Sequence, residues 1–157
     1  MATNRGKQFE EKFKENWLAT MPDASIDRIY DQISGRKTIS NISDFIGYTY
    51  PNIYYLECKS TVENTFNFKK LTQYDKLVKK VDIKGVRTGV IIWFIKHDRV
   101  IYVPIKTITA MKEDGLKSVN IREIDKTDYR FFNIPSVKLR VFLDSDYSVL
   151  LDAQDGD

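Results

Sequence analysis

The sequence predicts an α/β protein built on one mixed β-sheet with helices packed against it. Three patterns predict this class. An apolar stripe at helical spacing opens the chain, two strand-like runs then flank a short Pro-Asn turn, and a second helical pattern precedes two further apolar strands. This order of helix, strand, hairpin, helix, strand and strand favours a single sheet covered by helices.

The first helix is predicted over residues 5–18. Phe9, Phe13 and Trp17 recur at every fourth position, so they share one face of that helix. A short strand over residues 25–31 follows. The next stretch is polar, with Gly35-Arg36-Lys37 at its centre, and we predict a loop or a small projecting arm over residues 32–41.

A β-hairpin is predicted from two strand-like runs, residues 42–48 and 53–59, that flank the turn Thr49-Tyr50-Pro51-Asn52. If the hairpin is symmetric about this turn, the numbers of two paired residues sum to 101. That register places Asp44 opposite Glu57.

The remaining elements follow the same patterns. An amphipathic helix is predicted over residues 68–81, and strands are predicted over 90–95 and 100–105. The first of these strands is apolar throughout, which fits a strand covered on both faces. We expect one domain over residues 1–143, including the arm, and a mobile acidic tail over 144–157.

Composition restricts the function. The chain of 157 residues has 25 basic and 22 acidic residues, and five of the acids lie in the tail, so the remainder carries eight excess positive charges. Such a surface suits a polyanion such as DNA. A single cysteine, no secretory signal and no apolar run of membrane-spanning length favour a cytoplasmic protein.

The predicted hairpin carries the strongest chemical pattern, formed by Asp44, Glu57 and Lys59. Glu57 and Lys59 project from the same strand face, whereas Cys58 faces away. Carboxylates roughly 4.5–5.5 Å apart across a hairpin resist joint ionisation unless a cation lies between them. Oxygen ligands of this kind, completed by the Cys58 backbone carbonyl and water, suit Mg²⁺. Lys59 would steer a water nucleophile or offset charge on a phosphate.

The same side chains would also suit an exposed cross-strand ion pair, which contributes little to stability. Spacing alone does not decide between a metal site and an ion pair. Other chemistry has less support, because His97 is the only histidine and neither a phosphate-binding nor a dinucleotide-binding glycine motif is present.

The hairpin resembles the PD-(D/E)XK nuclease signature, with Ser43-Asp44, then Gly47, then Leu56-Glu57-Cys58-Lys59. More narrowly, the sequence resembles the RecU Holliday junction resolvases, including phage relatives. The resemblance runs from about residue 5 to about residue 135 and includes Arg5-Gly6-Lys7-Gln8-Phe9-Glu10-Glu11 and the segments 65–73, 89–105 and 115–124.

The resemblance implies a restriction-endonuclease-like fold and a Holliday junction resolvase of DNA recombination and repair. It implies that Asp44 and Glu57 bind Mg²⁺, with Mn²⁺ as a substitute, and that Lys59 assists the attacking water. It further implies that Glu10, with Glu11 as a rival, joins the site and that Gln73 orients water or phosphate. Paired cuts in opposing strands need two sites, and the resemblance implies a two-fold homodimer.

RecU proteins carry a long stalk between the first strand and the catalytic aspartate, whereas this chain has only residues 32–41 there. Arg36 and Lys37 are expected to contact DNA phosphates from this arm. Three further expected DNA contacts, on the second predicted helix, are Lys69, Lys70 and Lys76. The short arm keeps two alternatives open: a PD-(D/E)XK endonuclease for a flap, fork or duplex site, or a non-catalytic DNA-binding module.

Overall fold

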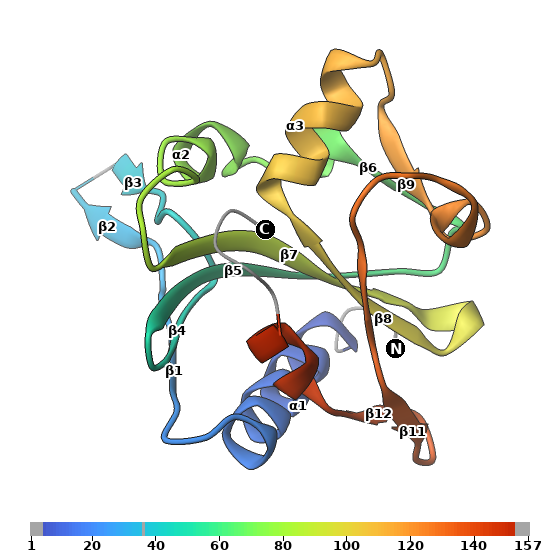
Figure 1. Ribbon diagram of the computed structural model, residues 1–157. Coiled ribbons are helices and arrows are strands. Elements are labelled where there is room, and N and C mark those ends of the chain that lie inside the picture. Colours follow the sequence, from blue (N-terminus) through green and yellow to red (C-terminus); the bar gives the residue numbers. More distant parts are fainter. Residues whose placement is uncertain (1–4, 36, 153–157) are drawn as a thin grey trace.

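A six-stranded mixed sheet forms the centre of the computed structural model, which describes residues 5–35 and 37–152 (Figure 1). Its strands, in spatial order, are β1 (Ser25–Arg28), β4 (Phe45–Thr49), β5 (Asn52–Thr61), β7 (Val86–Phe94), β8 (Arg99–Pro104) and β10 (Phe132–Ile134). The central β5 and β7 run parallel, and every other neighbouring pair is antiparallel. The predicted mixed sheet is confirmed.

Helices cover both faces of this sheet (Figure 1). The long helix α1 (Arg5–Thr20) and the 3-10 helix η5 (Tyr147–Asp152) lie on one face, and α2 (Tyr74–Val78) and α3 (Ile105–Glu113) lie on the other. The aromatic stripe of α1 is buried against the sheet as predicted. The apolar side chains of β7 point alternately to the two faces of the sheet, so they pack in both hydrophobic clusters.

The β4–β5 hairpin has the predicted register, because Phe45 pairs with Leu56 and Thr49 pairs with Asn52. Packing against α1 also constrains this hairpin. A Cβ added to Gly47 would come within 2.9 Å of the Trp17 ring, so only glycine lets the strand approach the helix this closely. Strand β4 begins at Phe45, three residues later than predicted, and β1 ends at Arg28, three residues earlier.

The single helix predicted over residues 68–81 is wrong. A 3-10 helix, η2 (Phe68–Lys70), ends at the non-helical Leu71, and α2 begins only at Tyr74. The Asn67 side chain caps η2 by accepting the Lys69 N–H at 2.9 Å, which favours a separate short turn there. The apolar positions Leu71 and Leu77 are nevertheless buried as the pattern indicates.

The mobile acidic tail predicted from residue 144 is also wrong as far as Asp152. Tyr147 and Leu150 are buried in the cluster beneath α1, and the Tyr147 ring meets Phe13 edge-on at 5.1 Å between centroids. Asp144 pairs with Lys12 at 2.6 Å. The acidic composition of this segment indicated a solvated tail, although Tyr147 and Leu150 attach it to the core. Residues 153–157 lie outside the described residues.

The predicted arm is a small two-stranded sheet, β2 (Gln32–Ser34) and β3 (Lys37–Ile39), which projects beside α2 (Figure 1). The remaining elements are β6 (Thr65–Asn67), β9 (Ser118–Asn120), β11 (Ser136–Lys138), β12 (Leu143–Ser145), η3 (Ile95–His97) and η4 (Ile124–Lys126). Within residues 5–35 and 37–152, no helix is long and apolar enough to cross a membrane.

Candidate active site

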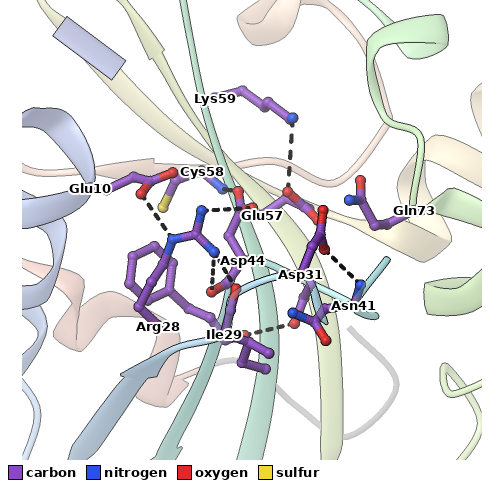
Figure 2. A network of polar contacts seen from close by, with 12 residues as sticks. Glu10, Arg28, Ile29, Asp31, Asn41, Asp44, Glu57, Cys58, Lys59 and Gln73 are labelled. Atoms are coloured by element: carbon purple, nitrogen blue, oxygen red, sulfur yellow. Dashed lines mark hydrogen bonds and ion pairs between the residues drawn. The ribbon is translucent and has the colours of Figure 1, made fainter. Parts of the chain in front are cut away.

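The candidate active site lies where β4 begins and its longer partner β5 continues. Because Phe45 opens β4 opposite Leu56, residues 57–61 of β5 extend beyond it. Asp44 directly precedes β4, and the same register brings it beside Glu57. The two sequence-predicted carboxylates therefore meet at an open sheet edge (Figure 2).

The backbone of Cys58 faces this edge. Its N–H donates to Asp44 Oδ2 at 3.1 Å, in the position that a longer β4 would occupy. Ile53 donates its N–H toward β7, to the carbonyl of Gly85. Because the N–H and C=O of one strand residue point the same way and alternate along the strand, the Cys58 carbonyl is also directed to the open edge. The Cys58 side chain is buried on the α1 face, as predicted.

Glu57 is the most unusual group at the site. Its side chain has 0% exposure, and neither carboxylate oxygen forms a hydrogen bond within the described part of the chain. Burial, followed by the neighbouring carboxylate of Asp44, raises the pKa of Glu57 to about 9. Lys59 lies on the same strand face, with its Nζ 3.9 Å from Glu57 Oε2. This ion pair is long and one-sided, so it leaves a buried carboxylate without a hydrogen-bonding donor among the described residues.

These donors fit a hard divalent cation. Two carboxylates and one backbone carbonyl at a sheet edge form an all-oxygen set, and the remaining positions would belong to water and phosphate. Among the described residues, no three acidic, histidine or cysteine side chains gather to hold a metal ion. A cation here would therefore depend on backbone, solvent or substrate oxygens as well as on Asp44 and Glu57.

Arg28 is the site residue that sequence reasoning missed. Its Nε donates to Glu10 Oε2 at 3.0 Å, and its Nη2 lies 3.7 Å from Asp44 Oδ1. It also donates from Nη1 to the backbone carbonyls of Ile29 and Asp44. The pairing of β1 with β4 would have revealed this role, because Arg28 pairs with Phe45 and therefore lies next to Asp44. The sequence did not indicate which strand β1 would join.

Two residues assigned through the resemblance also lie around this centre. Glu10 reaches it from α1, joined to Asp44 through Arg28 rather than by direct contact. Gln73 stands at the start of α2, and Figure 2 shows its side chain directed toward Glu57. Its amide oxygen accepts a hydrogen bond from Thr72 Oγ1 at 2.8 Å. Glu11 is exposed and makes no corresponding contact with any residue in 5–35 or 37–152.

The expected DNA-binding cations are spread over two elements. Lys69 and Lys70 are exposed on η2. Lys76, on α2, donates from Nζ to the backbone carbonyl and hydroxyl of Ser40, both at 2.6 Å, and so ties the arm to this helix. Lys37 belongs to β3, and Arg36 lies outside the described residues.

Comparison with known proteins identifies the family. A search of the curated proteins gives no match. Among solved structures, the Holliday junction resolvase Hjc from the hyperthermophilic archaeon Archaeoglobus fulgidus matches with 15% identity and a TM-score of 0.49, covering 65% of this chain and 78% of that one. The family model for RecU, recombination protein U, matches residues 26–144, which include both carboxylates and Lys59. The resemblance seen in the sequence is confirmed, and this chain belongs to the RecU family.

Proposed function

We propose that this chain is a metal-dependent endodeoxyribonuclease that resolves four-way DNA junctions, with Asp44, Glu57 and Lys59 as its catalytic residues. One observation carries the assignment of the site. Glu57 is fully buried, makes no hydrogen bond through its carboxylate within the described residues, and lies beside a second carboxylate at an open sheet edge. Family membership supplies the reaction class.

Each residue of the candidate active site has a separate role in the proposed reaction. Asp44, Glu57 and the Cys58 carbonyl would hold Mg²⁺, or Mn²⁺ in its place, and the ion would supply Lewis-acid charge to the scissile phosphate and activate a water. Lys59, 3.9 Å from Glu57, orients the attacking water or offsets charge on the phosphate. Gln73 orients water or phosphate from the other side of Glu57.

Glu10 acts through Arg28 in this proposal. The carboxylate fixes the guanidinium at 3.0 Å, and the guanidinium in turn faces Asp44. Such an arrangement leaves Glu10 as a positioning residue rather than a direct metal ligand.

Junction resolution requires two coordinated cuts, so we propose a two-fold homodimer with one site in each subunit. Its expected products are 5′-phosphate and 3′-hydroxyl ends. Its place of action is the cytoplasm, where recombining DNA of a bacterium or an infecting phage is found.

A second substrate class is favoured by one specific feature. The arm has only two three-residue strands, β2 and β3. Such an arm offers little surface for gripping a junction, so cleavage of flaps, forks or a duplex site is the alternative. A DNA-binding module without catalysis is disfavoured, because burying Glu57 among acids brings no benefit to a protein that only binds phosphates.

The deciding experiment incubates the full chain with an end-labelled four-way junction, its constituent duplex, a flap and a fork, in Mg²⁺ and in EDTA. We expect symmetric paired nicks in the junction, dependent on Mg²⁺ or Mn²⁺ and at least ten times faster than cleavage of the duplex. Faster cleavage of the flap or fork would support the alternative substrate. Binding without cleavage in either metal would contradict the enzyme assignment.

A further inference from the structure

A cleft of about 430 Å³ lies between the first half of α1 and the end of β1, next to Phe45, the residue that follows Asp44. Its basic and aromatic lining comes from Lys7, Lys14, Arg28 and Tyr30, and Glu10 and Glu11 also line it. Arg28 both lines the cleft and faces Asp44 at 3.7 Å, so the cleft and the candidate active site share this side chain as a wall.

Arg28 is fixed on several sides. Glu10 holds its Nε, and the guanidinium carbon lies 5.0 Å from the centroid of the Tyr30 ring and 5.6 Å from that of Phe45. A guanidinium held over aromatic rings keeps its orientation at low entropic cost on binding. The cleft therefore contains a preorganised cation next to the expected position of the scissile phosphate.

Tyr30 supplies a flat surface. The residue is 73% exposed although its ring lies against a cation, so the ring remains open to solvent over most of its area. An exposed aromatic ring beside positive charge is the arrangement by which proteins stack nucleobases without regard to sequence. Tyr50, at the β4–β5 turn, is similarly exposed at 78% but does not line the cleft.

Lys7 and Lys14 complete the cleft from α1. They are seven residues apart, which places them on the same side of the helix two turns from each other. Among the described residues, neither forms an ion pair. Both ammonium groups are thus available to phosphates along the cleft wall.

We propose that this cleft binds the nucleotide adjacent to the scissile phosphate, with its base stacked on Tyr30 and its flanking phosphates held by Lys7 and Lys14. A volume of about 430 Å³ falls within the range of pockets that enclose a small ligand. The occupant is a nucleotide of the DNA strand rather than a free one, because Arg28 lines the cleft and also faces Asp44 of the candidate active site. This inference rests on the proposed function for the identity of the neighbouring phosphate.

Photo-crosslinking tests the position of the base. Four-way junctions carrying 5-iododeoxyuridine at one position at a time around the branch point are bound to the full chain in EDTA, irradiated and analysed by mass spectrometry. We expect a crosslink to Tyr30 from one position next to the mapped cut. Tyr30→Ala should abolish this crosslink, whereas Tyr50→Ala should leave it unchanged. Crosslinks from no position, or equal crosslinks to Tyr50, would overturn the proposal.

Binding measurements separate stacking from phosphate contact. Tyr30→Ala should weaken junction binding about tenfold, the scale of one lost base–aromatic stack, with an unchanged salt slope, and Tyr30→Phe should restore it. Lys7→Ala with Lys14→Ala should lower the salt slope by up to about two units. The control, Lys126→Ala with Lys138→Ala, removes two lysines of η4 and β11 that pair with Glu123 and Asp98 and do not line the cleft.

The two proposals fail in different ways. A Tyr30 crosslink without cleavage in Mg²⁺ or Mn²⁺ would contradict the nuclease assignment and support the cleft as a nucleotide site. Cleavage with wild-type affinity and wild-type rate in Tyr30→Ala would overturn the cleft and leave the nuclease intact.

Discussion

Asp44 Oδ2 accepts the backbone N–H of Cys58 over 3.1 Å. The hydrogen bond replaces a strand partner that β4 does not provide, because that strand begins one residue later. It thereby fixes one carboxylate oxygen against the edge of β5 and leaves the other toward Arg28. Backbone geometry, rather than side-chain packing alone, positions the carboxylate beside Glu57.

The first prediction concerns this pair. Asp44→Asn or Glu57→Gln should abolish junction cleavage, because each removes an anionic ligand from the proposed metal site. DNA binding in EDTA should remain equal or become tighter, because a negative charge facing phosphate has been lost. Gel assays of cleavage and fluorescence anisotropy of binding measure the two effects. Near-normal cleavage by either variant in Mg²⁺ would refute the metal-site assignment.

The second prediction follows from the pKa of Glu57, which rises from an ordinary value of 4.5 to about 9 in the folded protein. The folded, metal-free protein holds this proton where the unfolded chain has lost it. The contribution of protonated Glu57 to the free energy of unfolding is complete below the unfolded pKa. It is lost as the pH rises through the folded pKa. Glu57→Gln keeps the neutral shape at every pH and has no such dependence.

The difference in Tm between Glu57→Gln and the wild type should therefore increase from about pH 5 to about pH 8.5 in EDTA, with the variant more stable. Scanning calorimetry at several pH values measures it, with Glu63→Gln, an exposed glutamate of the same chain, as control. Mg²⁺ should stabilise the wild type more than the variant. A Tm difference that stays constant or shrinks with rising pH would argue against a buried, proton-holding Glu57.

The third prediction separates chemistry from binding at Lys59. Lys59→Ala should lower single-turnover cleavage by at least about 10²-fold, the usual scale for losing one transition-state electrostatic group. Affinity for the junction should change little, because the Nζ atom pairs with Glu57 and the side chain is only partly exposed. Weaker binding with unchanged turnover of bound DNA would make Lys59 a phosphate anchor instead.

The fourth prediction tests the C-terminal segment. Tyr147→Ala should reduce the free energy of unfolding by about 3–5 kcal/mol, because it removes a fully buried ring packed on Phe13. Urea unfolding measures the loss, and Leu151→Ala, at a half-exposed neighbouring position, should cost much less. Equal losses of free energy of unfolding from the two substitutions would indicate that residues 144–152 are only loosely attached.

The site was more predictable than some of the fold. A four-residue turn sets the register of a hairpin, so Asp44 and Glu57 could be paired from local sequence alone. The apolar spacing around Leu71 matches a continuous helix, so this spacing did not predict the break, and the local signal against it is the Asn67 side chain that caps η2 at the Lys69 N–H. The anchoring of Tyr147 depends on its contact with Phe13, a residue distant in sequence that it meets only in the folded chain.

Arg28 shows a different limit. It belongs to an edge strand, and its contacts to Glu10 and Asp44 need two elements to meet that are distant in sequence. No local pattern selects one arginine among many for such a role. Carboxylates separated by one tight turn are, in contrast, visible as a pair.

The last prediction concerns the arm and decides between the two substrate classes. Arg36→Ala with Lys37→Ala should weaken binding to the four-way junction more than binding to duplex and should erode the symmetry of the paired cuts. The reason is geometric. The arm projects beside α2, and Lys76 holds its base through Ser40, so a contact made there would lie outside the active site.

Competition binding at matched salt measures both affinities, and Ser40→Ala serves as a control that removes one of the two Lys76 contacts without changing charge. If the arm cations hold only phosphates, junction and duplex affinities should fall together and the salt slope should drop by up to about two units. Equal losses would remove the arm from junction selectivity. Selectivity would then have to arise from the geometry of the dimer and from the basic surface of η2 and α2.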